Sequence, residues 1–168
     1  MKLSNVVKSA LAAVVLGSLV LALAPMSADA ATATTTFAVT ATVVATCLIS
    51  ATPLGFGSYT GVVDPATSTV TITCTNTTPY NVGLSAGLAT GATVTTRSMT
   101  GPASALLGYG LFTNAGHTTN WGLTIGTDTV TGTGNGAAQP ITVFGQIPAA
   151  EYVAPGAYAD TITATVTF

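Results

Sequence analysis

Few side chains in this sequence could do chemistry, and their spacing offers little support for a catalytic or metal site. His117 is the one histidine in the chain. A metal site needs several nitrogen, sulfur or carboxylate ligands, and none lies near His117 in the sequence. A serine or threonine nucleophile needs an adjacent base that a third group holds in place. We therefore expect no metal, no cofactor and no enzymatic activity, and we expect His117 to lie in an exposed loop.

Residues 1–30 have the three parts of a cleaved signal peptide. Two lysines supply a charged start, an apolar run covers 11–24, and the sequence SADA offers Ala28 and Ala30 as the small residues of a cleavage site. A membrane anchor is the alternative, but the run is shorter than the roughly 20 residues that cross a bilayer. We predict cleavage after Ala30 and export of residues 31–168.

The exported segment carries very few charges. Charged residues make up 5% of the whole chain, whereas an average globular protein has about 25%. Arg97 is the only basic residue after the predicted cleavage site, and the acidic residues there are Asp64, Asp128, Glu151 and Asp160. Without a basic patch, binding of nucleic acid phosphates is not expected. An ion pair between Arg97 and one of the four acids is expected, because buried arginines usually have a carboxylate partner.

The two cysteines, Cys47 and Cys74, allow a single disulfide pairing. An even number of cysteines in an exported chain favours a disulfide over free thiols, since the compartment is oxidising. Closing a loop of this size contributes on the order of 3 kcal/mol in the chain-entropy account. We predict that Cys47 and Cys74 are bonded.

Alternation of apolar and polar residues predicts strands, and no helical period is evident in the exported segment. The segments with this alternation or with mostly apolar residues are 68–75, 80–87, 105–112, 141–147 and 157–168. Glycine and proline turn signals separate them at intervals of roughly ten residues. This pattern is typical of an all-β sandwich. We expect Trp121 and Tyr109 to pack in its core rather than to stack on a sugar.

The segment 34–47 reads TTTFAVTATVVATC and predicts a strand whose partner is not obvious. One face of this strand would carry Phe37, Val39, Ala41 and Val43. The segment has no charge, glycine or proline, and an uncovered strand of this kind would aggregate. The final segment repeats the pattern, with threonines opposite a row that contains Ile162, Ala164, Val166 and Phe168 and that Asp160 interrupts.

Over 31–168 the sequence resembles the spore coat protein U family, the subunits of archaic chaperone–usher pili. The blocks that carry this resemblance follow one another in order: LGFGSYTG, STVTITCTNTTPYNVGL, LGYGLFTNAGHTTNWG and PGAYADTITATVTF. The resemblance implies an incomplete immunoglobulin-like β-sandwich that is completed by donor-strand exchange. It also implies a donor strand over 31–44 and a pilin-like domain over 45–168.

The same resemblance implies roles for particular residues and partners. The donor strand would anchor in another copy through Phe37, Val39, Ala41 and Val43. The acceptor groove, and before assembly a periplasmic chaperone, would pair along the strand of Ile162, Ala164, Val166 and Phe168. The expected partners are further copies of the chain, the chaperone and an outer-membrane usher, without nucleic acid or a small-molecule substrate.

These features favour a structural subunit of an extracellular pilus, exported to the periplasm and then to the cell surface. The resemblance implies a use in adhesion or biofilm formation. Two alternatives remain at this point. One is a spore or surface coat protein of the same fold. The other is a monomeric carbohydrate-binding sandwich whose N-terminal strand completes its own sheet, although the sequence has no polar and aromatic cluster suggestive of a sugar site.

Overall fold

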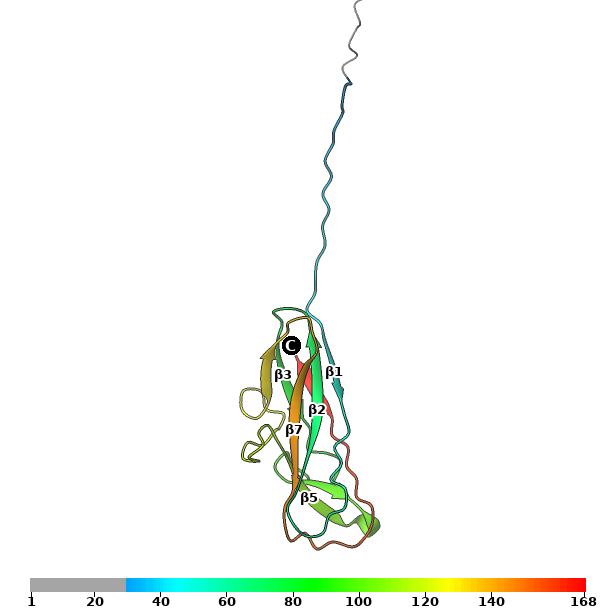
Figure 1. Ribbon diagram of the computed structural model, residues 1–168, viewed down its shortest axis with the longest axis vertical. Coiled ribbons are helices and arrows are strands. Elements are labelled where there is room, and N and C mark those ends of the chain that lie inside the picture. Colours follow the sequence, from blue (N-terminus) through cyan, green and yellow to red (C-terminus); the bar gives the residue numbers. More distant parts are fainter. Residues whose placement is uncertain (1–29) are drawn as a thin grey trace, which may run out of the picture. The chain divides into compact units, whose positions relative to one another are not determined.

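The computed structural model describes residues 30–168 (Figure 1), so the predicted signal peptide lies, except for its last residue, outside the described residues. The chain divides into two units between Thr40 and Ala41. Residues 30–46 contain no strand, and the β domain begins at Cys47. Within the described residues no helix is long and apolar enough to cross a membrane.

The described domain consists of β-strands and one 3₁₀ turn, η1 (Pro102–Ser104). The strands are β1 (Cys47–Ala51), β2 (Asp64–Cys74), β3 (Pro79–Leu84), β4 (Arg97–Thr100), β5 (Leu106–Phe112), β6 (Val130–Thr133), β7 (Gln139–Ile147) and β8 (Ala164–Thr167). One sheet has the order β1-β2-β7-β5-β4 and the other the order β6-β3-β8. Within each sheet, neighbouring strands pair in antiparallel fashion.

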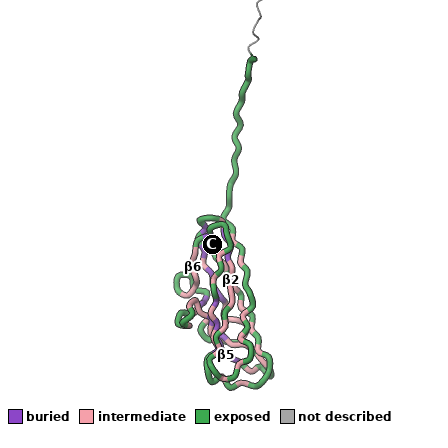
Figure 2. Tube along the Cα trace, viewed as in Figure 1, coloured by how far each residue is buried: buried purple, intermediate pink, exposed green. Residues whose placement is uncertain are grey.

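Alternating apolar residues from both sheets meet in one core, which confirms the predicted all-β sandwich. The buried apolar residues are Val70, Ile72, Cys74, Tyr80, Val82, Leu84, Leu107, Tyr109, Leu111, Trp121, Val143 and Ile147. Figure 2 shows the buried residues along the interior of the domain. Trp121 is fully buried, and its indole Nε1–H donates to the Val82 carbonyl at 2.8 Å. The prediction that Trp121 and Tyr109 are core residues is therefore confirmed.

The structure corrects several strand predictions. β4 and β6 are four-residue strands that the sequence pattern did not predict. β2 already begins at Asp64, within a segment that contains a proline turn signal, because β7 pairs with it from Ile147 onward. β8 is shorter than predicted, because the segment before it first bridges to Thr100 through Ala159 and only then reaches β3.

The predicted disulfide joins Cys47 to Cys74. The two residues are directly opposite in the pairing of β1 with β2, with their Cα atoms 4.1 Å apart. The bond therefore attaches the first residue of β1 to the last residue of β2. It fixes the entry of the chain into the domain.

Arg97 is buried without the predicted ion pair. Its side chain is 1% exposed, and its guanidinium donates to four main-chain carbonyl oxygens: those of Ser85 at 2.8 Å, Val94 at 2.7 Å, Leu84 at 3.0 Å and Trp121 at 2.6 Å. Burial lowers the pKa of Arg97, and the surrounding acidic groups oppose that effect. The ion-pair expectation was wrong because the planar guanidinium, with five donors, satisfies the main chain of three separate segments.

Replacement of Arg97 by lysine should destabilise the fold although the charge is kept. A single ammonium group cannot reach all four carbonyl oxygens, and each buried acceptor left without a donor costs about 1–3 kcal/mol. We expect Arg97→Lys to lower the free energy of unfolding by at least about 2 kcal/mol, measured by urea denaturation. The matched control is Thr131→Ser at an exposed site on β6, and equal losses for both variants would contradict the assigned role.

Candidate functional site

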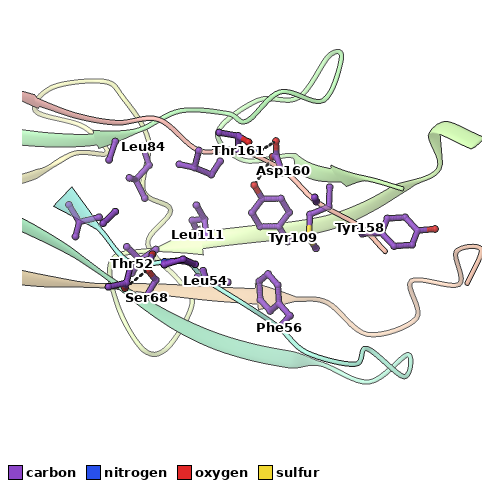
Figure 3. A pocket seen from close by; sticks show the side chains of 18 residues that line it. Thr52, Leu54, Phe56, Ser68, Leu84, Tyr109, Leu111, Tyr158, Asp160 and Thr161 are labelled. Atoms are coloured by element: carbon purple, nitrogen blue, oxygen red, sulfur yellow. Dashed lines mark hydrogen bonds between the residues drawn. The ribbon is translucent and has the colours of Figure 1, made fainter. Parts of the chain in front are cut away.

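The candidate site is a groove that opens between β1 and the segment leading into β8. Its cavity volume is about 410 Å³. The residues along it are Ala51, Thr52, Pro53, Leu54, Phe56, Ser68, Val70, Leu84, Met99, Tyr109, Leu111, Val143, Tyr158, Ala159, Asp160, Thr161, Ile162 and Ala164. Figure 3 shows Thr52, Leu54 and Phe56 on one side of it and Asp160 and Thr161 on the other. The groove is thus bounded by chain segments from opposite sheets.

The floor of the groove is the hydrophobic core itself. Val70 and Val143 belong to the larger sheet and Leu84 to the smaller one, and all three are buried core residues that also line the cavity. Half-buried Leu54 and Phe56 pack against the same core, and the ring of Phe56 lies edge-to-face with Tyr109 at 6.1 Å between centroids. The cavity therefore exposes apolar surface that a complete sandwich would cover.

The two strands beside the groove are sheet edges. Within residues 30–168, β1 pairs only with β2, and β8 pairs only with β3. The Thr75 amide donates to the Thr46 carbonyl, and the Ser85 amide donates to the Thr163 carbonyl. Because hydrogen-bonding directions alternate along an antiparallel strand, the main-chain groups of Ile49 in β1 and of Ala164 in β8 point away from these partners. Both edges therefore offer unpaired main-chain groups.

The residues predicted for the acceptor strand occupy this edge in part. Ile162, Ala164 and Val166 are half-buried and pack against the core, while threonines alternate with them on the exposed face. Ile162 and Ala164 line the groove directly. Phe168 differs from the others, because it follows the last paired residue and its ring is 55% exposed.

The residues predicted for the donor strand lie outside any strand. Every described residue from 30 to 46 is exposed, with exposed fractions of 84% for Phe37, 83% for Val39 and 86% for Val43. The described chain thus contains an apolar groove with free edges and, separately, an uncharged segment with large exposed apolar side chains.

One end of the groove is polar. The Tyr109 hydroxyl donates to Asp160 Oδ2 at 2.7 Å, and the Leu88 amide donates to Asp160 Oδ1 at 2.8 Å. Burial and the hydrogen bond to Asp160 raise the pKa of Tyr109 well above its ordinary value. Sequence reasoning recognised Asp160 as a break in the apolar row and as one possible partner of Arg97. Its partners could not be inferred, since they come from β5 and from the loop after β3.

The loops at residues 54–61 and 151–158 line a second cavity, of about 850 Å³. It brings together Tyr59, Tyr152, Tyr158 and Glu151, a gathering that sequence reasoning missed because the loops are far apart in the chain. Tyr59 holds the two loops together, since its hydroxyl donates to the Pro148 carbonyl at 2.6 Å and accepts from the Glu151 amide at 3.1 Å.

The environment of His117 is different from the predicted exposed loop. The residue lies in a turn with φ of 51°, is half-buried, and its ring is edge-to-face with Phe112 at 5.3 Å between centroids. Among residues 30–168 no three histidine, cysteine, aspartate or glutamate side chains gather closely enough to hold a metal ion.

Comparison with known proteins identifies relatives with the same architecture. A family model described as the Spore Coat Protein U domain matches residues 33–165. Protein U of Myxococcus xanthus is 35% identical over 181 aligned positions, which cover 98% of this chain and 99% of that protein. A crystal structure of the CsuC–CsuE chaperone–tip adhesion subunit pre-assembly complex, from the archaic chaperone–usher Csu pili of Acinetobacter baumannii, matches with a TM-score of 0.59 and 27% identity.

That structural match covers 76% of this chain but only 41% of the solved chain, so this chain spans less than half of its length. The shared architecture and the antiparallel sheets confirm the predicted fold class, an incomplete immunoglobulin-like sandwich.

The burial of Tyr109 and its hydrogen bond to Asp160 should produce a specific dependence of stability on alkaline pH. The native state holds the Tyr109 proton more tightly than the unfolded chain, in which the pKa is about 10. The stability that the fold gains by holding this proton is therefore complete below pH 10 and falls as the pH rises above that value. We expect the free energy of unfolding of Tyr109→Phe to fall less steeply above pH 10 than that of the wild type, by up to about 1.4 kcal/mol per pH unit.

Urea denaturation at pH 7 and at several values above pH 10 measures this difference. At pH 7 the variant should lose only the hydrogen bond, about 1 kcal/mol. Parallel curves for the two proteins above pH 10 would show that the Tyr109 proton is not held by the fold.

Proposed function

The chain belongs to the Spore Coat Protein U domain family of pilus and coat subunits, and we propose that it is a structural subunit of an extracellular fibre assembled by donor-strand exchange. In this proposal the N-terminal segment 31–44 of one copy fills the groove between β1 and β8 of the next. The observation that carries it is the groove, which has a hydrophobic floor and an unpaired strand edge on each side.

The donor segment has the properties that such a groove requires. A strand that adds to a sheet gains affinity from main-chain hydrogen bonds and specificity from every second side chain. Phe37, Val39, Ala41 and Val43 alternate with threonines and an alanine, and no charge interrupts them. Complete burial of each larger apolar side chain contributes about 1.5–3 kcal/mol, so three such anchors would hold the strand firmly.

The arrangement favours exchange between copies over completion of a chain's own sheet. Only Val44, Ala45 and Thr46 separate the last anchor from Cys47. A tight hairpin back along β1 would favour glycine or asparagine at positions with positive φ, and this connection has neither. A head-to-tail contact that does not close on itself generates a filament.

The proposed partners are further copies of the chain, a periplasmic chaperone that occupies the groove before assembly, and an outer-membrane usher. The chaperone–subunit complex solved for the Csu pilus supports the chaperone as a partner. Export would depend on the signal peptide proposed for residues 1–30. A use in adhesion or biofilm formation is part of the proposal, as is a structural rather than enzymatic role.

A coat protein is the second candidate. The observation that favours it is the match to the Spore Coat Protein U domain model, together with the similarity to Protein U over nearly the whole of both chains. Polymerisation through the same groove would serve either a fibre or a coat, so electron microscopy of the assembled protein distinguishes them. The carbohydrate-binding alternative loses support, because Trp121 and Tyr109 are core residues.

Deletion of the donor segment should abolish polymers. Strands held in such grooves dissociate slowly, so the exported wild-type protein should give a ladder of multimers in detergent without boiling, and a monomer after boiling. Deletion of residues 31–44 should leave only a monomer or a pair with the chaperone. A wild-type monomer without boiling would contradict the proposal and favour a self-completed domain.

A charge on the anchoring face should have the same effect as the deletion. Phe37→Asp would place a carboxylate in the apolar groove, where a charge without a partner is very unfavourable, so the ladder should be lost while the domain remains folded. Thr36→Asp is the matched control, because residue 36 is on the opposite face of the strand, and it should still polymerise. If both variants polymerise like the wild type, the donor assignment is wrong.

A further inference from the structure

Resting on the proposed function, we infer that Asp160 and Tyr109 fix the position of the donor strand in the groove. The donor strand runs antiparallel to β8, with Ala41 opposite Asp160, Val39 opposite Ile162 and Phe37 opposite Ala164. The argument has three parts: the immobility of the Asp160 carboxylate, the direction in which the chain enters the domain, and the sizes of the side chains that would meet.

The Asp160 carboxylate occupies a fixed place in the row of residues that faces the groove. Tyr109 and the Leu88 amide hold its two oxygens (Figure 3 shows the contact with Tyr109). A side chain at Gly87 would place its Cβ 1.9 Å from Oδ2, so the backbone there presses against the carboxylate. An incoming strand therefore cannot push Asp160 aside, and must present a small side chain at that point.

The main chain of this segment presents alternate residues to the groove. Ala159 exchanges two hydrogen bonds with Thr100, at 2.9 and 3.1 Å, and Thr163 accepts one from Ser85. Ala159 and Thr163 thus use these main-chain groups within the existing sheets. The even-numbered residues, among them Ile162 and Ala164, direct their main-chain groups toward an incoming strand.

The direction follows from where the chain enters the domain. The Thr46 carbonyl is bonded to Thr75, at the end of the sandwich where β8 also finishes, because Thr167 lies opposite Asn81 in β3. In an open fibre every copy has the same orientation. The end of one domain where the chain enters and β8 finishes therefore meets the other end of the next domain, where the segment leading into β8 begins. The donor strand then runs opposite to β8. A parallel donor would instead join two copies reciprocally in a closed dimer.

Side-chain size distinguishes three neighbouring registers, which differ from one another by two residues along the donor strand. In the inferred register the methyl group of Ala41 meets Asp160, and the largest donor ring, Phe37, meets Ala164, the smallest apolar residue of the row. A shift of two residues in one direction places Val43 against Asp160. The opposite shift places Val39 there. Of these three, only the inferred register avoids a branched side chain against the fixed carboxylate.

Cysteine pairs on the outer face of the donor strand test this register without changing the groove. Thr163 is exposed, and in the inferred register it lies opposite Ala38 in a pair without hydrogen bonds. The Cα separation in such pairs, about 4.5 Å, permits a disulfide. Ala38→Cys is combined in one chain with Thr163→Cys, and in matched chains with Thr161→Cys or Thr165→Cys, which report the two shifted registers.

Each variant is expressed as the full exported chain, and its multimers are run on gels after boiling, with and without reductant. We expect the combination with Thr163→Cys alone to give a ladder that survives boiling and disappears on reduction. A preferred cross-link to residue 161 or 165 overturns the register. An unboiled ladder with no cross-link in any combination overturns the inferred register, and a closed dimer overturns the antiparallel direction. If the wild type forms no multimers at all, the proposed function itself fails, and this inference fails with it.

The role of Asp160 in selecting the register is tested by enlarging the donor residue Ala41 and shortening its partner Asp160. Ala41→Val should lower the yield of multimers about tenfold, because overpacking a filled site is unfavourable, and Asp160→Ala in the same chain should restore it. Ala38→Val is the control on the outer face and should assemble normally. Normal assembly of Ala41→Val would overturn the role of Asp160. Where Asp160→Ala prevents folding, the cross-links obtained with Asp160 intact still decide the register.

Discussion

The organisation of this domain depends on one unfilled place between β1 and β8. Hydrogen bonding within a sheet and burial of apolar side chains normally reinforce each other, because the same strand supplies both. Here both are interrupted at the same place: β1 and β8 each have a partner on one side only, and the core residues Val70, Leu84 and Val143 line the opening between them. The rest of the domain is built to remain folded around this opening. Arg97 connects the main chain of three segments inside the sandwich, and Asp160 connects β5 to the loop after β3.

These internal connections show what two of the few charged residues do: each holds separate chain segments together by hydrogen bonds. A guanidinium or carboxylate removed from water is costly unless hydrogen bonds compensate for its lost hydration. Arg97 is compensated by four carbonyl oxygens, and half-buried Asp160 by the Tyr109 hydroxyl and the Leu88 amide. The polar interior therefore holds the two sheets in a fixed relation without filling the groove.

The sequence allowed the long elements to be predicted and left the short ones undetermined. Most of β2, β3, β5 and β7 have clear alternation or a continuous apolar run, and the disulfide followed from the only two cysteines. β4 and β6 have four residues each, too few for a periodic pattern, and they exist because β5 and β3 pair with them. Ile162 and Ala164 were predictable as groove residues from their alternation. Leu54, Phe56 and the partners of Asp160 were not, since their positions depend on contacts between distant segments.

The disulfide at the entry of the chain also determines how the domain would carry a mechanical load. Tension applied to the N-terminal segment reaches the domain at Cys47, the first residue of a strand only five residues long. On its own, so short a strand would be held by only a few hydrogen bonds. The covalent bond to Cys74 transfers the tension at once to β2, the longest strand of the domain, which pairs with β7 along nine positions. The load is thus shared by many bonds in parallel, so the domain resists extension at its weakest edge.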